Sequence, residues 1–144
     1  MKRLIICSLF AALSLASIRA AEGDKEVQAR NVALNLAGAF SNDGFKIRDG
    51  HWSGAIKPGD RALVAVNLYA GNQYWFSVGA EDEDAKFAVQ VFDENGKPVK
   101  ADDYQGDATA AAGYSPTISG QYFVSIAPSG GEQASTYCLV YSYK

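Results

Sequence analysis

Hydrophobic and polar residues follow three different patterns along this chain of 144 residues. Residues 4–18 are mostly apolar and carry no charge, and residues 22–41 have apolar positions at helical spacing. From Phe45 onward, apolar and polar positions alternate with a period of two, which is typical of half-buried β-strands. We therefore expect an N-terminal leader, a short helix and a domain made of strands.

The apolar run at the start has the layout of a secretory signal peptide. Lys2 and Arg3 precede it, Ala20 and Ala21 follow it, and a polar stretch begins at Glu22. A positive start, a short apolar run and small residues at the end are the features of a cleaved signal. The alternative, a membrane anchor, needs about 20 apolar residues, and this run ends after fifteen. We expect residues 1–20 to be a signal peptide and the protein to be exported, to the periplasm or outside the cell.

Residues 21–44 are expected to form a helix and a linker. Val27, Leu34 and Gly38 fall on one stripe with Ala37 beside it, and Val32, Leu36 and Phe40 extend the apolar surface. Asp24 is the expected N-cap, and the run from Ser41 to Gly44 is a stop signal.

Residues 45–144 are expected to form an antiparallel, jelly-roll-like β-sandwich of seven to nine strands. Glycine-containing turns such as Asp49-Gly50, Pro58-Gly59-Asp60, Gly71-Asn72 and Asn95-Gly96 separate the short alternating segments, as in other sandwiches. The expected strands are 45–48, 51–56, 61–69, 73–79, 86–93, 98–100, 109–114, 121–127 and 135–143. One face of the five clearest strands supplies the expected core: Val64, Val66, Leu68, Tyr74, Phe76, Val78, Phe87, Val89, Val91, Tyr122, Val124, Ile126, Tyr137, Leu139 and Tyr141.

The opposite faces of these strands carry more apolar residues than a bare sandwich should expose. The residues concerned are Leu63, Ala65, Trp75, Phe92, Phe123, Cys138 and Val140. We expect the N-terminal helix to cover this second face, because its own apolar stripe also needs burial. The alternative is an exposed patch that binds a partner.

The strand and turn residues resemble the bacterial pre-peptidase C-terminal (PPC) domain across about residues 52–143. The segments that carry the resemblance are KPGDRALVAVNLYAGNQYWFSV (57–78), VQVFDENGKPV (89–99), SPTISGQYFVSI (115–126) and TYCLVY (136–141). The resemblance implies a jelly-roll-like sandwich with a binding, solubility or processing role beside a secreted enzyme. Here only about thirty residues separate the expected signal from the sandwich, so a role as an accessory to a protease is not expected.

Composition and charge narrow the classes of partner. The formal net charge is −3, and without residues 1–20 it is about −6, so no basic surface points to nucleic acid. Cys7 belongs to the expected signal, which leaves Cys138 either buried as a small apolar residue or free for pairing with another chain.

Catalysis is not expected. His51 is the only histidine, Ser53 lies two residues away, and neighbours in sequence do not make a catalytic triad. We therefore predict a binding or structural protein, with a carbohydrate-binding module as an alternative, a protein inhibitor or assembly partner as another, and a small secreted hydrolase as the least favoured.

Two groups of residues are candidates for ligand binding. Two acidic clusters in expected loops could hold calcium, which takes six to eight oxygen ligands. The alternative is that both clusters are solvated, as charge runs more often are. The first cluster is Glu81, Asp82, Glu83 and Asp84, and the second is Asp102, Asp103 and Asp107. No other cofactor is indicated. The candidates for an aromatic platform that binds a polysaccharide or a peptide are Trp52, Trp75 and Tyr69, with Tyr104, Tyr114 and Tyr143 as further members. The alternative is burial of Trp75 beneath the helix.

Overall fold

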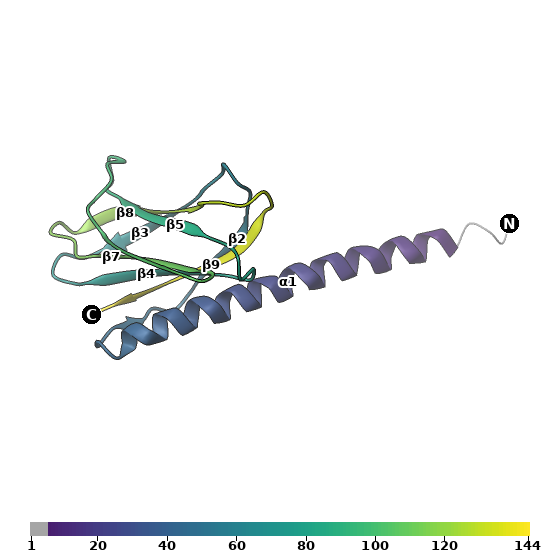
Figure 1. Cartoon of the computed structure of the whole chain (residues 1–144), viewed down its shortest axis with the longest axis horizontal. Coiled ribbons are helices and arrows are strands. Elements are labelled where there is room, and N and C mark those ends of the chain that lie inside the picture. Colours follow the sequence, from purple (N-terminus) through teal and green to yellow (C-terminus); the bar gives the residue numbers. More distant parts are fainter. Residues whose placement is uncertain (1–5) are drawn as a thin grey trace.

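The computed structural model describes residues 6–144, and their side chains from Gly23 onward. One helix precedes nine strands (Figure 1). The elements are α1 (Ile6–Ser41), β1 (Lys46–Ile47), β2 (Trp52–Ile56), β3 (Ala62–Leu68), β4 (Tyr74–Ala80), β5 (Phe87–Phe92), β6 (Asp102–Gly106), β7 (Thr109–Tyr114), β8 (Gly120–Pro128) and β9 (Ser135–Tyr143).

The strands form two antiparallel sheets that face each other as a β-sandwich, as the alternation predicts. The larger sheet has the order β1-β9-β4-β7-β6, with β2 also paired to β9, and the smaller sheet has the order β3-β8-β5. Neither order follows the sequence, because β8 and β9 return to pair with strands from the first half of the chain. The chain also passes repeatedly from one sheet to the other, since β3, β5 and β8 belong to the smaller sheet and the strands between them belong to the larger one. This alternation between the two sheets is the jelly-roll-like feature of the fold.

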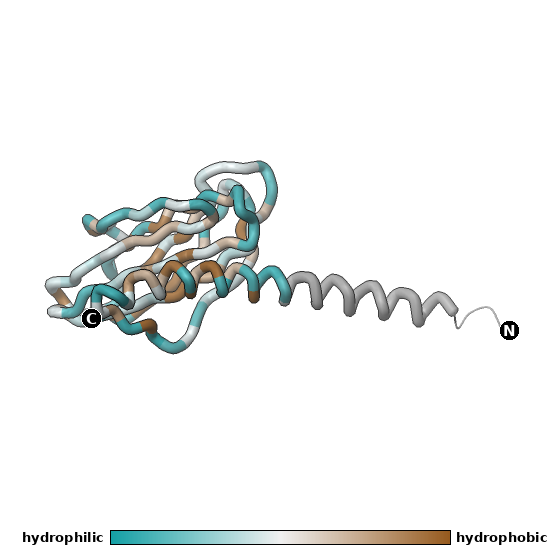
Figure 2. The backbone as a smooth tube through the Cα atoms, turned by 60° about the horizontal axis from the view of Figure 1, so that its bottom comes forward, coloured by the Kyte–Doolittle hydropathy of each residue, from teal (hydrophilic) through white to brown (hydrophobic). Residues whose placement is uncertain are grey.

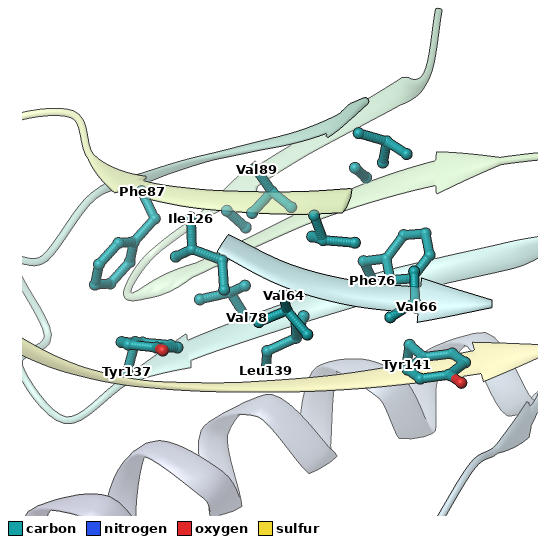
Figure 3. Packing of buried hydrophobic residues seen from close by; sticks show 14 of the residues in the cluster. Val64, Val66, Phe76, Val78, Phe87, Val89, Ile126, Tyr137, Leu139 and Tyr141 are labelled. Carbon is teal, nitrogen blue, oxygen red and sulfur yellow. The ribbon is translucent and has the colours of Figure 1, made fainter. Parts of the chain in front are cut away.

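All fifteen residues of the expected core are buried in one cluster between the sheets. Figure 3 shows Tyr137, Leu139 and Tyr141 of β9 projecting toward the smaller sheet and away from α1, which lies on the other side of β9. The period of two is therefore confirmed as the signal that selects core residues.

Helix α1 packs across the outer face of the larger sheet (Figures 1 and 2). Its contact surface is built on Ala29, Ala33 and Ala37, which are buried together with Cys138 and Val140 of β9. Beneath them, a Cβ atom on Gly79 of β4 would lie only 2.9 Å from the Cα of Ala33. The helix approaches the sheet closely because both surfaces are made of small residues.

The expected stripe on the helix was wrong. Val27 and Leu34 are exposed on α1, whereas Val32, Leu36 and Phe40 are partly buried on the side of the sheet. Large side chains at the centre of the contact would hold the helix away from Gly79, so alanines occupy it. Asp24 is not an N-cap either, since α1 continues without a break to Ile6.

The helix ends where the sequence predicts. The amide of Gly44 donates to the carbonyl of Ser41 at 3.0 Å, and Gly44 has a φ of 91°, which a glycine adopts readily.

In the part of the chain that the structure describes, no helix is long and apolar enough to cross a membrane. Residues 1–5 of the expected signal lie outside the described residues, and the signal itself stays a prediction.

The apolar residues expected on one second face in fact divide between two surfaces. Trp75, Cys138 and Val140 lie under α1 on the larger sheet, where β4 and β9 are buried on both faces. Leu63 and Ala65 lie on the outer face of the smaller sheet, where exposed and buried positions of β3 alternate. Phe92 and Phe123 share that outer face. The helix therefore covers three of the seven residues of the expected set.

Two segments differ from the expected strands. Residues 102–106 form the edge strand β6 rather than a loop, and its acidic residues are compatible with an edge because charge discourages further strand pairing. Residues 98–100 do not form a strand, and Pro98 makes a single bridge to Phe92.

Candidate functional site

Trp75 is packed into the contact between α1 and the larger sheet. The rings of Phe40 and Trp75 are stacked with their centroids 4.4 Å apart and their planes 5° apart. On the strand beside it, a Cβ atom on Gly113 would lie 2.9 Å from the Trp75 ring. One face of the indole therefore meets Phe40, the ring also lies against Gly113, and Trp75 is partly buried rather than presented as an open aromatic platform.

Trp52 is packed against an aromatic residue of β9. The half-buried Trp52 stacks on Tyr141, with centroids 5.9 Å apart, and the guanidinium of Arg48 lies 5.7 Å from the centre of the same Tyr141 ring. Burial raises the pKa of Tyr141, Arg48 lowers it, and the neighbouring Tyr74 and Tyr69 raise it. Of these aromatic candidates, Trp52 is therefore the one whose ring stacks on Tyr141.

Tyr69 is the most exposed of the aromatic residues proposed for ligand binding, with 58% of its surface accessible to solvent. Its backbone amide donates to the hydroxyl of Tyr74 at 2.9 Å, and the side-chain amide of Asn72 donates to the same oxygen at 3.2 Å. These bonds fix the turn between β3 and β4 while the Tyr69 ring remains in solvent.

His51 and Ser53 do not form a catalytic pair. His51 is exposed just before β2, whereas Ser53 pairs in register with Cys138 of β9. Among the described residues, the buried hydroxyl of Ser53 has no hydrogen-bond partner.

The two acidic clusters proposed for calcium binding lie in different parts of the fold, one in the loop between β4 and β5 and the other on β6 and directly after it. Glu81 forms an ion pair with Lys25 of α1 at 3.4 Å, and Asp82 accepts a hydrogen bond from the amide of Asp84. Asp102 and Asp103 lie on β6, where neighbouring side chains point to opposite faces. Asp107 forms an ion pair with Lys86 at 3.4 Å, and Glu83 is exposed. Within the described residues, no three acidic, histidine or cysteine side chains are grouped around a possible metal position.

Cys138 is a buried free thiol beneath α1. Burial raises its pKa, against smaller lowering effects from Ser53 and Arg30 and a smaller raising effect from Glu26. A buried thiol with a raised pKa is a poor nucleophile, so the thiol behaves here as a small apolar residue.

The outer face of the smaller sheet carries an apolar recess of about 100 Å³, which we call the Leu63 recess. Arg61, Leu63, Phe92, Gly96 and Phe123 line it. Half of the Leu63 surface is exposed, and the guanidinium of Arg61 lies 5.9 Å from the centre of the Phe92 ring. Phe92 and Phe123 are direct cross-strand neighbours on β5 and β8, so their rings form a continuous apolar surface.

A second, more polar pocket of about 220 Å³ lies at one end of the sandwich, between the turn after β5 and the segment between β7 and β8. We call it the Tyr114 pocket. Its lining comprises Asp93, Glu94, Asn95, Val99, Tyr114, Thr117, Ile118, Ser119, Gly120, Gln121 and Tyr122. Ile118 is 72% exposed at the rim, and carboxylates, amides and hydroxyls line the interior.

Of the residues that line the Tyr114 pocket, Tyr114 is the one that the sequence offered as a ligand-binding candidate, as part of an aromatic platform; the other lining residues were not expected. The turn signal Asn95-Gly96 and the loop segment SPTIS (115–119) are both visible in the sequence, but they lie about twenty residues apart. Only the pairing of β5 with β8 brings them together. Arg61 was missed for a similar reason, since its approach to Phe92 depends on the order β3-β8-β5.

The sequence matches no protein-family model and no curated protein. Several solved structures align with it, among them three at low identity. They are PliG of Aeromonas hydrophila, a periplasmic lysozyme inhibitor of g-type lysozyme (15% identity, 66% of this chain and 85% of that chain, TM-score 0.49), a structure titled "CBM4 structure and function" (18%, 75% and 83%, 0.45), and a de novo designed double-stranded β-helix (12%, 64% and 97%, 0.36). These likenesses concern the fold at most, and no functional statement rests on them.

Proposed function

We propose that this chain is an exported, non-catalytic binding module, similar in architecture to the PPC domain, whose partner is a protein. The observation that carries the proposal is the Leu63 recess. On the larger sheet α1 covers the outer face of β4 and β9, whereas the smaller sheet presents a half-exposed leucine in a recess that two phenylalanines also line. Exposed apolar surface rimmed by polar residues is typical of protein interaction sites.

The recess also favours a particular chemistry in the partner. It has room for one aliphatic side chain, and an anchor in a small pocket is how many protein interfaces gain most of their affinity. Arg61 borders the recess and forms no ion pair with any of residues 23–144. The partner surface should therefore present an aliphatic side chain beside a carboxylate that pairs with Arg61.

The proposed interaction can be tested with a matched pair of variants. Leu63 and Val27 are exposed to similar extents, 50% and 45%, but Val27 lies on α1, outside the recess. A partner isolated from the exported fraction of the native cell and then purified should bind the Leu63→Lys variant at least about tenfold more weakly. It should bind the Val27→Lys variant as it binds the unmodified chain.

Titration calorimetry with the purified partner would measure both effects. Equal loss of affinity in both variants, or no loss in either, would show that the Leu63 recess is not the binding surface. Removal of the Arg61 guanidinium by Arg61→Ala should also weaken binding, whereas Lys57→Ala, a change at an exposed lysine nearby in sequence, should not.

Export is tested separately. Mass spectrometry of the protein from the exported fraction should find a mature chain that begins at Ala21. An intact N-terminus in the cytoplasmic fraction would contradict this part of the proposal and leave the binding surface to be judged by the variants above.

A further inference from the structure

We propose that the Tyr114 pocket is a binding site for a single sugar residue, independent of the protein partner proposed above. The pocket lies at the end of the sandwich, beside the turn that also borders the Leu63 recess, and it has its own set of lining residues. Its volume of about 220 Å³ is below the 300–1,000 Å³ of pockets for drug-sized molecules, so it suits a small ligand.

The wall on the side of β5 is held in place by one carboxylate oxygen. Asp93 Oδ1 accepts hydrogen bonds from the backbone amides of Asn95 and Lys97, both at 2.9 Å. Gly96 completes this turn with a φ of 78°. The second oxygen of Asp93 is left to accept a hydrogen bond from a ligand, beside the exposed carboxylate of Glu94.

The opposite wall, residues 115–119, is held by two further hydrogen bonds. The hydroxyl of the buried Tyr122 donates to the carbonyl of Ile118 at 2.7 Å. Ser119 Oγ accepts from the amide of Ala70 at 2.8 Å, which ties the segment to the turn between β3 and β4. Both walls are therefore set before any ligand arrives, which lowers the entropic cost of binding.

Tyr114 supplies a ring and a hydroxyl to the lining of the pocket. Its ring lies 5.5 Å from that of Tyr122, centroid to centroid. Burial, a hydrogen bond to Tyr122 and the nearby charges of Tyr122 and Asp93 raise the pKa of Tyr114 to about 12. The hydroxyl thus stays protonated and remains a hydrogen-bonding group over the whole physiological range.

The mixture of groups matches a sugar better than an ion. A sugar ring offers apolar C–H surface, which packs on rings and aliphatic side chains such as Tyr114 and Ile118. Its hydroxyls both donate and accept, so they can pair with carboxylates and with the amide of Gln121 at once. No lysine or arginine lines the pocket, which disfavours phosphate and carboxylate ligands, and its two carboxylates alone are too few for a calcium site.

Chemical-shift mapping by NMR on the full mature chain tests the proposal. The probes are the neutral sugars glucose, galactose, mannose and N-acetylglucosamine, each titrated to 50 mM, with N-acetyl-arginine amide as a competing chemistry. We expect at least one sugar to cause saturable shifts in the amides of residues 93–95 and 117–121. No saturable shift there with any of the sugars, or saturation only with the arginine derivative, would overturn the proposal.

Two variants with one control separate binding from folding. Glu94→Gln should weaken sugar binding by about tenfold, because a hydrogen bond to a charged group is lost, and Tyr114→Ala should abolish it. Glu83→Gln changes another exposed acid far from the pocket and should have no effect. Equal affinity of the Glu94 and Glu83 variants would also overturn the proposal, even if Tyr114→Ala failed to fold.

Discussion

The Phe40 ring of α1 lies parallel to the Trp75 ring of β4, with 4.4 Å between their centroids. This pair closes the end of a contact that begins with alanines at Ala29 and Ala33. The helix therefore approaches the sheet closely at one end and is anchored by stacked aromatic rings at the other. Because the helix contributes a buried surface of its own, we treat it as part of the folded domain.

The first prediction concerns the close approach at Gly79. A Cβ atom on Gly79 would collide with the backbone of Ala29 and Ala33. We expect Gly79→Ala to lower the free energy of unfolding by about 1–3 kcal/mol, the usual cost of an overpacked contact, as measured by urea denaturation.

Gly38 of α1 provides the control for that experiment. A Cβ atom there would meet nothing within 4 Å, so Gly38→Ala should stabilise the helix by about 0.5–1 kcal/mol through helix propensity. Similar effects of the two substitutions would contradict the described contact.

The second prediction uses Trp75 as a reporter of the helix. Phe40→Ala should destabilise the domain by about 2 kcal/mol, because a partly buried aromatic partner is removed. It should also shift tryptophan emission to the red and increase quenching by acrylamide, since the Trp75 ring gains solvent. Leu34→Ala, which truncates an exposed residue of the same helix, should change neither the emission nor the quenching.

The third prediction concerns two serine hydroxyls beneath the helix. Ser77 and Ser142 are fully buried, and neither hydroxyl has a hydrogen-bond partner among the described residues. An unpaired buried hydroxyl costs free energy, so Ser77→Ala and Ser142→Ala should be neutral or should stabilise the fold by up to about 1 kcal/mol.

Ser119 is the contrasting case, because its oxygen accepts the Ala70 amide. Ser119→Ala should cost about 0.5–1 kcal/mol. Thermal unfolding followed by circular dichroism would compare the three variants, and a large loss of stability at Ser77 or Ser142 would show that its hydroxyl is paired.

The fourth prediction is a loss of stability in alkaline solution. Burial raises the pKa of Tyr137, Tyr141 and Cys138, and that of Tyr114 to about 12. The unfolded chain, with ordinary values of 10.0 for tyrosine and 9.0 for cysteine, loses these protons first. Their contribution to stability is therefore complete below about pH 9, and it decreases as the pH rises toward 12.

Urea midpoints at pH 7, 9 and 10.5 would measure this effect. Tyr137→Phe should make the alkaline decline shallower, because one of the groups is removed, whereas Tyr104→Phe, at an exposed position on β6, should leave it unchanged. A midpoint that is constant up to pH 10.5 would contradict the prediction.

The sequence determined the core and most of the strands because both depend on local alternation; the edge strand β6, which carries acidic residues in place of an apolar alternation, was the one it missed. Residues such as Val64, Phe76 and Leu139 are identified by a period of two, whatever the order of the strands in the sheets. The turns are equally local, since glycines such as Gly71 and Gly96 have positive φ angles that other residues rarely adopt.

Only the tertiary structure decided which apolar residues are covered and which stay open. Trp75 and Leu63 look alike in the sequence pattern, yet one lies beneath α1 and the other faces solvent, because their strands belong to different sheets. The face that α1 uses also depends on the sheet, since Gly79 favours alanines over Val27 and Leu34. Local periodicity shows that a side chain points away from the core, but what lies over it depends on pairing between residues distant in the chain.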